Sequence, residues 1–146
     1  GTLTRFDGGR QSGSAGGYVL AEQQVWKLDP EAKETGRGVS VFGGLDWADE
    51  DVSIFSNHYS IGISLNGPFD FRPKDAVDVG FSSARLSRAA GAEFRREHEQ
   101  AMETFYRAQV TPWLSIKPDL QYIINPGGQE SLSDALVATV RVEIVF

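Results

Sequence analysis

The chain has 146 residues, the size of one domain, with 20 acidic and 14 basic residues and a formal charge of −6. It has no cysteine, which excludes a disulfide framework and a thiolate metal site, and it has no Lys/Arg cluster that would indicate a nucleic-acid partner. No apolar run approaches the roughly 18 residues of a transmembrane helix, but the composition remains compatible with transmembrane β-strands, which alternate polar and apolar residues.

The first third of the chain contains a loop, a weak strand, a turn and a clear strand. Residues 8–17 are rich in Gly and Ser and predict a loop, residues 17–27 predict a strand with poorly separated faces, and residues 28–36 predict a turn. No export signal is present at the start of this sequence. Residues 39–47 then alternate cleanly between apolar and polar side chains, which is the period of a strand.

The remainder of the chain repeats this alternation. Residues 53–66, 75–86, 101–110 and 116–125 predict strands, and residues 87–100 predict a long polar connection with room for a short helix. Residues 134–146 predict a last strand, whose apolar face consists of Leu136, Ala138, Val140, Val142, Ile144 and Phe146. A terminal Phe on the apolar face is typical of the strand that closes an outer-membrane barrel, although a last strand packed on an ordinary core has the same pattern.

The predicted connections fall into two groups. Counted back from the last strand, the segments near 126–134, 87–100, 48–52 and 1–16 lie on one side of the sheet, and those near 111–115, 67–74 and 28–36 lie on the other. Outer-membrane barrels have short periplasmic turns and longer outer loops, and this pattern is matched in part, because 48–52 is short and 28–36 is not.

Several motifs resemble one known family. They are Tyr106-Arg107 with Gln109, the Thr-Pro-Trp-Leu turn at 111–114, Lys-Pro-Asp-Leu-Gln-Tyr at 117–122, Asn-Pro-Gly-Gly at 125–128 and the terminal Phe146, with supporting pieces at 22–23, 37–42, 62–68 and 72–75. Over about 125 residues, from near Gly17 to the end, the chain resembles the carbohydrate-selective porins of the OprB type. It departs from them at Gly43-Gly44, where the family pattern leads us to expect an arginine in the lumen.

The resemblance implies an all-β fold, an antiparallel transmembrane β-barrel fragment of about seven strands. Residues 1–146 would be the C-terminal portion of a sixteen-stranded porin barrel about three times as long, with the N-terminal strands and the signal peptide absent. In the family, the loops that fold inward to narrow the pore come mainly from the earlier part of the barrel. Seven strands cannot close a wide pore, so we expect a curved open sheet with two unpaired edges.

The resemblance also implies a function, which is passive diffusion of carbohydrates through a water-filled barrel in the outer membrane of a Gram-negative-type bacterium. The implied partners are carbohydrate solutes, outer-membrane lipid and, through the C-terminal strand, the barrel-assembly machinery, with a homo-oligomer possible in this family. No covalent chemistry, cofactor, metal or nucleic acid is expected.

The polar faces of the strands supply the candidate pore-lining residues. A lumen needs hydrogen-bonding side chains that replace part of a sugar's water shell and bind weakly enough for release. The candidates are Glu103, Arg107, Gln109, Asp119, Gln121, Arg141, Glu143 and His58, with Ser60 and Asn66 nearby. Alternatively, these charges pair with one another and only keep the wall hydrated. The expected interface aromatic anchors are Trp47, Tyr59, Tyr106, Trp113, Tyr122 and Phe146.

Two other classes of protein remain open at this stage. One is a soluble antiparallel β-protein that binds a small ligand inside, and the other is an outer-membrane barrel with a structural or adhesive role. Enzymatic interpretations are weak. His58 and His98 lack a metal-ligand spacing. Glu103 and Glu143 could form a glycosidase pair, but charges that face a pore explain them equally well. The direction of the apolar face distinguishes the membrane protein from the soluble one.

Overall fold

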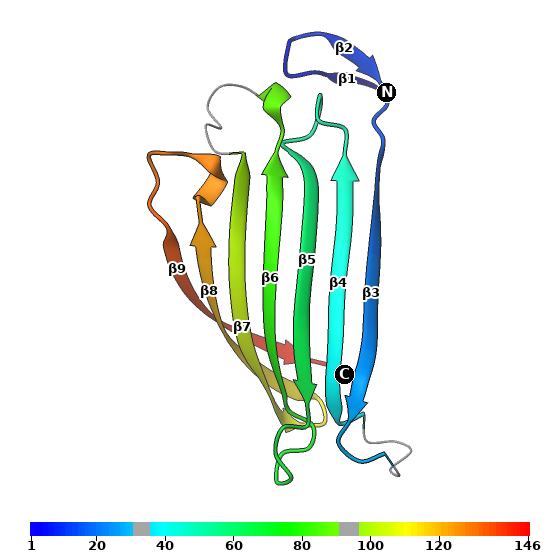
Figure 1. The fold of residues 1–146 in the computed structure, drawn as a ribbon, viewed down its shortest axis with the longest axis vertical. Coiled ribbons are helices and arrows are strands. Elements are labelled where there is room, and N and C mark those ends of the chain that lie inside the picture. Colours follow the sequence, from blue (N-terminus) through cyan, green and yellow to red (C-terminus); the bar gives the residue numbers. More distant parts are fainter. Residues whose placement is uncertain (31–35, 91–96) are drawn as a thin grey trace.

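The fold is a single curved antiparallel sheet with a small hairpin at one end (Figure 1). The computed structural model describes residues 1–30, 36–90 and 97–146. Seven strands pair in chain order: β3 (Gly16–Lys27), β4 (Gly38–Ala48), β5 (Phe55–Asn66), β6 (Ala76–Leu86), β7 (His98–Thr111), β8 (Leu114–Ile124) and β9 (Ala135–Ile144). Each joins the next through an antiparallel ladder, so the sheet is a plain meander.

The seven predicted strands are confirmed, with shifts at their ends. The largest shift is in β7, which begins at His98 because His98, Glu99 and Gln100 still pair with residues 83–85 of β6. The last strand ends at Ile144, before the predicted end at Phe146, although the N–H of Val145 still donates to the carbonyl of Trp113 at 2.9 Å. Two 3-10 turns, η1 (Arg88–Ala90) and η2 (Pro126–Gly128), lie in the connections after β6 and β8. No helix among the described residues is long enough to cross a membrane.

The predicted loop at residues 8–17 is wrong in part. A hairpin of β1 (Thr2–Thr4) and β2 (Arg10–Ser12) precedes β3 and lies beyond the upper end of the sheet in Figure 1. Contacts with a distant segment hold this hairpin. Arg5 forms an ion pair of 2.7 Å with Asp51, the N–H of Phe6 donates to the Asp51 carbonyl at 3.0 Å, and Gln11 contacts Asp49.

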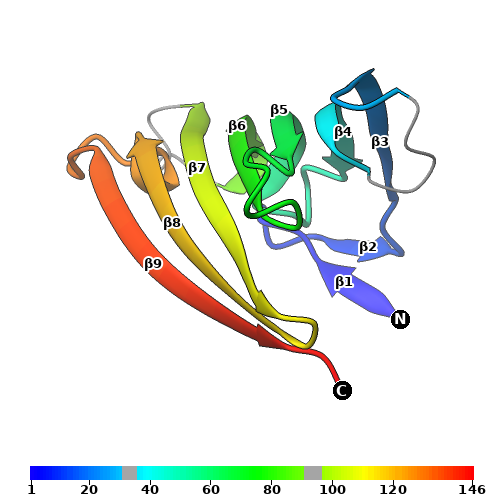
Figure 2. The same cartoon turned by 90° about the horizontal axis from the view of Figure 1, so that it is seen from below.

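The sheet curves like part of a barrel wall and does not close (Figure 2). Among the described residues, β3 pairs only with β4 and β9 pairs only with β8, so both edges are open, as expected. The connections alternate between the two ends as predicted. Those after β4, β6 and β8 lie at the upper end of Figure 1, and those after β3, β5 and β7 lie at the lower end together with the C-terminus.

The two faces of the sheet differ in chemistry. On β5, Ser56, Gly62 and Ser64 are buried on the inner, concave face, because curvature crowds the side chains there. Ile61 and Tyr59 point to the outer, convex face, and Ile61 is 61% exposed. On the edge strand β9, the outer-face residue Val140 is 68% exposed. The apolar face of each strand therefore lies on the outside of the curve.

The sheet encloses no apolar core. Among the described residues, Ala76 and Leu86 are the two buried apolar side chains, whereas the large apolar residues of the outer face are exposed. A soluble protein of this size would bury its apolar face against another layer. The soluble alternative is therefore not favoured, and the outer face is suited to contact hydrocarbon.

Candidate functional site

The candidate pore-lining residues gather on the inner face of the sheet. The register places Glu103 of β7 opposite Gln121 of β8, and Gln109 opposite Ser115. Glu143 of β9 is opposite Ser115 on the other side of β8, and Arg141 is opposite Lys117. Arg107 and Asp119 belong to the same alternating sets on β7 and β8. His58 is on the inner face of β5, whose polar set also includes the candidates Ser60 and Asn66.

The charged residues in the middle of this face do not neutralise one another through close ion pairs. The ion pairs within 4.0 Å between described residues involve the ends of the sheet, the hairpin and His58, and none involves Glu103, Arg107, Asp119, Arg141 or Glu143. The alternative in which these charges simply pair is thus not supported by the geometry. Two of the acids instead have neighbours on β8, where the carboxyl of Glu103 interacts with Asp119 and Gln121, and Glu143 accepts a hydrogen bond from Ser115.

Asp119 and Arg107 have polar side-chain atoms that are buried on this face. Asp119 is only 7% exposed, its two carboxylate oxygens are buried without a donor among the described residues, and its carboxyl group interacts with that of Glu103. The buried Nε of Arg107 likewise lacks an acceptor among the described residues. A buried carboxylate and a buried guanidinium N–H without partners are costly unless something else satisfies them.

Three other candidates have local partners. The Nδ1 of His58 lies 2.7 Å from the carboxylate of Asp46 on β4, so this histidine belongs to a cross-strand pair. The side-chain amide of Gln109 donates to the carbonyl of Thr111 at 2.7 Å, where β7 is irregular. Glu143 accepts a hydrogen bond of 3.2 Å from the hydroxyl of Ser115. These contacts fix the side chains against the wall.

The structure adds inner-face residues that the sequence did not single out. A polar hollow of about 260 Å³ lies on this face and is lined from both edges of the sheet, by Glu22 of β3 and Glu143 of β9. Its lining also includes Asp78, Arg107 and Lys117. The ammonium of Lys117 lies 3.4 Å above the ring of Phe105, a cation–π contact. Phe105 lies on the inner face together with the polar residues of β7. Phe42 lies on the inner face together with the polar residues of β4.

The ring of Phe42 lies over a glycine of the neighbouring strand. The register aligns Phe42 with Gly62 of β5 and Gly80 of β6 in one row across the sheet. A Cβ at Gly62 would overlap the ring of Phe42, so the ring can occupy this position only because residue 62 is a glycine. A signal was present in the sequence, since an apolar residue stands at a polar position of the alternation. The role of this residue could not be inferred from the sequence, because it depends on which residue of the neighbouring strand lies opposite Phe42.

A buried carboxylate anchors the lower end of the sheet. Asp75 is 2% exposed and accepts hydrogen bonds from Arg72, from the hydroxyl of Tyr106 and, at 3.0 Å, from the N–H of Gln109. Burial alone would raise the pKa of Asp75, but these hydrogen bonds together outweigh it and hold the pKa below its ordinary value of 3.8. The turn between β5 and β6 is thereby fixed to β7.

The predicted aromatic anchors lie in two groups. Trp47, Tyr59 and Tyr122 are near the upper end of the sheet, where Tyr122 donates to Asp134 at 3.0 Å. Tyr106, Trp113 and Phe146 are near the lower end, and the hydroxyl of Tyr106 belongs to the Asp75 network. Two aromatic groups toward opposite ends of an apolar face are the arrangement expected of interface anchors in transmembrane barrels.

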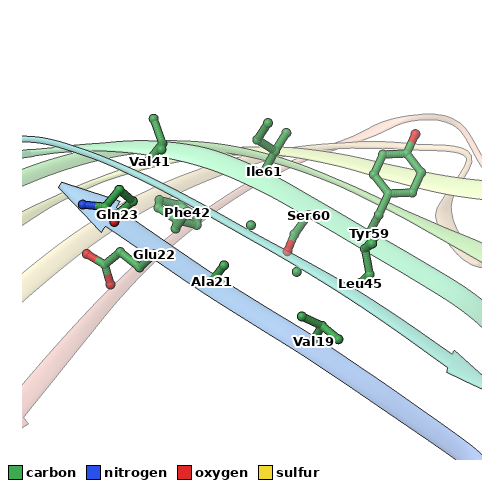
Figure 3. Close-up of a pocket in the computed structure, with 12 residues that line it drawn as sticks. Val19, Ala21, Glu22, Gln23, Val41, Phe42, Leu45, Tyr59, Ser60 and Ile61 are labelled. Atoms are coloured by element: carbon green, nitrogen blue, oxygen red, sulfur yellow. The ribbon is translucent and has the colours of Figure 1, made fainter. Parts of the chain in front are cut away.

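The outer face is hollowed between β3, β4 and β5. Small residues at Ala21 and Gly43 lie below the flanking Val41, Ile61 and Tyr59 and open a groove of about 640 Å³. In Figure 3, Val41, Ile61 and Tyr59 point to one side of the sheet, whereas Glu22 and Ser60 point to the other. The groove is therefore part of the apolar outer surface.

Among the described residues, no group of three or more His, Asp or Glu side chains is placed to hold a metal ion.

A curved meander of strands of ten to fourteen residues, apolar outside and charged inside, is a segment of a transmembrane β-barrel wall. Comparison with known proteins agrees. The family model for "Carbohydrate-selective porin, OprB family" matches residues 2–146. The chain belongs to this family of porins.

Individual relatives show the same relationship. Porin B of Pseudomonas aeruginosa is 32% identical over 163 residues, which cover 99% of this chain and 35% of that protein. Porin AaxA of Chlamydia abortus is 27% identical over 117 residues, covering 80% of this chain and 26% of that porin. The high-pH structure of Pseudomonas putida OprB superimposes with a TM-score of 0.85 over 98% of this chain and 41% of that chain, at 24% identity. The chain thus spans between about a quarter and about a third of the length of these two relatives.

Proposed function

We propose that this chain forms the C-terminal portion of the wall of a larger porin barrel, through which carbohydrates cross an outer membrane by passive diffusion. The observation that carries the proposal is the inner face, on which the charged side chains of Glu103, Arg107, Arg141 and Glu143 have no ion-pair partner within 4.0 Å among the described residues. Family membership supports a channel rather than an enzyme.

The proposed mechanism is exchange of hydrogen bonds along the wall. A sugar that enters the lumen loses part of its water shell, and the inner-face groups replace that water. Glu103 and Glu143 accept hydrogen bonds from sugar hydroxyls, whereas Arg107 and Arg141 donate to them. Each contact remains exposed to competing water, so the sugar is released again and moves down its gradient.

The position of the wall in the membrane follows from the same proposal. The outer face contacts lipid, the two aromatic groups lie at the two interfaces, and the loops at the upper end of Figure 1 face outward. We place the protein in the outer membrane of a Gram-negative-type bacterium, in line with the bacteria of its relatives. Recognition of β9 by the barrel-assembly machinery and assembly into a homo-oligomer stay predictions.

Liposome swelling tests the proposal. The whole porin that contains this chain, reconstituted in liposomes, is expected to admit neutral mono- and disaccharides at rates that fall with solute size. An outer-membrane barrel with a structural or adhesive role would give no swelling above that of protein-free liposomes. Protein that stays soluble without detergent and migrates identically on a gel with and without heating would contradict the barrel itself.

A further inference from the structure

The outer face of the sheet carries a pair of basic side chains near its upper end. Tyr59 points to the outer face, and its ring packs beside that of Phe81 with a centroid distance of 6.1 Å, so Phe81 lies on the same face. Arg85 is four residues further along β6 and therefore shares that face. Its partner in the register is His98, the first residue of β7. The pair lies one outer-face position nearer the upper end than Tyr59, which is opposite Ser83.

This pair is the exception on an otherwise uncharged face. Among the described residues of β3 to β9, the register places every other Lys, Arg, Asp, Glu and His side chain on the inner face. Charged side chains are costly in hydrocarbon, but just beyond the aromatic Tyr59 they reach the level of the lipid headgroups. Two basic residues side by side at that level complement an anionic headgroup.

Arg85 has hydrogen-bond donors available for such a group. Its side chain is 37% exposed, and its guanidinium lies 3.9 Å from the carboxylate of Glu97, which is too long for a hydrogen bond. That carboxylate is closer to Arg88, at 2.7 Å. The planar guanidinium presents its N–H groups in a fork that matches two oxygens of a phosphate, and the imidazole of His98 adds an N–H donor.

The apolar groove of the outer face begins beside this pair. Tyr59 lines the groove and is opposite Ser83, which stands two residues before Arg85 on β6. From Tyr59 the groove continues over the small residues Ala21 and Gly43 toward the middle of the sheet. Neighbouring strands are about 4.8 Å apart, so the part of the groove over β4 is about 10 Å across the sheet from β6. A lipid with several acyl chains spans that width.

We propose that Arg85 and His98 bind the phosphate of a multi-chain lipid of the outer leaflet, and that one of its acyl chains occupies the groove between β3, β4 and β5. The inference rests on the proposed position of the wall in the membrane and is independent of sugar passage. The basic pair attracts the phosphate, and the groove buries the apolar chain. A free phosphate ion makes only the first contact, and a lipid without phosphate makes only the second.

The test counts bound lipids by native mass spectrometry. The whole porin is refolded from denaturant into detergent, so that it carries no cellular lipid, and is titrated with lipid A, which has several acyl chains and phosphate groups. Arg85→Gln is expected to raise the Kd for lipid A roughly fivefold, because one of the two basic groups is lost. The matched control is Arg10→Gln, which removes the same charge from an exposed position on the β1–β2 hairpin and is expected to leave the Kd unchanged.

Two further variants test the parts of the site separately. Glu97→Gln removes the acidic neighbour of Arg85 and is expected to lower the Kd for lipid A, the opposite direction to Arg85→Gln. Ala21→Leu fills the groove and is expected to raise the Kd. Its control is Val140→Leu, on the outer face of β9 and outside the groove, which is expected to have no effect.

The outcomes separate the lipid site from the pore. Equal Kd values for Arg85→Gln and Arg10→Gln would overturn the site. So would displacement of lipid A by an equal concentration of inorganic phosphate, or binding of diacylglycerol as tightly as lipid A, because each removes one half of the proposed contact. Sugar-driven liposome swelling is expected to be the same for all these variants, so failure of the lipid site leaves the porin intact.

Discussion

At the scale of single residues, Asp75 shows how a buried charge holds a turn. Its partners Arg72 and Gln109 come from the β5–β6 turn and from β7, so one carboxylate joins two segments that are more than thirty residues apart. Asp70 lies in the same turn, where it forms an ion pair of 2.8 Å with Arg37 and remains almost fully exposed. The two aspartates therefore form a natural comparison between a buried and an exposed acceptor.

We expect Asp75→Asn to destabilise the whole porin by about 1.5–3 kcal/mol, because hydrogen bonds to a buried charged group are lost and Arg72 loses its counter-ion. Asp70→Asn is the control, with an expected loss below about 1 kcal/mol, since an exposed ion pair contributes little. Denaturant unfolding in detergent micelles, followed by tryptophan fluorescence, measures both. Equal losses for the two variants would contradict the assigned role of Asp75.

The lowered pKa of Asp75 also predicts a dependence on pH. Because its pKa is lower in the folded than in the unfolded chain, unfolding takes up a proton as the pH falls below the ordinary value of 3.8. The stabilising contribution of Asp75 is thus complete above that value and is lost as the pH falls through the folded pKa. The difference in unfolding midpoint between the unmodified protein and Asp75→Asn should shrink below pH 3.8, and a constant difference would argue against this linkage.

At the scale of the strand, β9 separates two environments residue by residue. Val140 is on the outer face and its neighbour Thr139 is on the inner face, opposite Asp119. Val140→Arg is expected to cost roughly 2–4 kcal/mol if the site lies near the bilayer midplane, whereas Thr139→Arg should cost much less because it faces water. Refolding titrations into lipid vesicles compare the two variants directly. A larger loss for Thr139→Arg would reverse the assignment of the faces.

The strands were predictable from sequence because each face meets a different medium, which imposes a period of two on residues such as those of β5 and β9. The position of Phe42 was not interpretable in the same way, since its packing depends on Gly62, which the register of β4 and β5 places opposite it. The β1–β2 hairpin was missed because contacts between Arg5 and Asp51, rather than local alternation, hold it. The roles of the inner-face residues in transport stay predictions.

At the scale of the whole molecule, the open edges of β3 and β9 decide what the segment does alone. A sheet with unpaired N–H and C=O groups along two edges is unstable in hydrocarbon and encloses no lumen. We expect residues 1–146, expressed and reconstituted alone, to give no stable unitary conductance in a planar bilayer, whereas the whole porin does. Discrete, long-lived channels from the segment alone would show that it closes by assembling with copies of itself.

The short connection between β2 and β3 is a suitable site for inserting a peptide epitope. Gly13 has a backbone φ of +85° and open space around it, and residues 13–15 are exposed next to the braced hairpin. A peptide epitope inserted after Gly13 should therefore be tolerated, and antibody should stain it on intact cells. The same epitope inserted after Phe71, in the β5–β6 turn at the opposite end of the sheet, should be stained only after the cells are permeabilised. Flow cytometry of living cells would then read the orientation of the barrel directly.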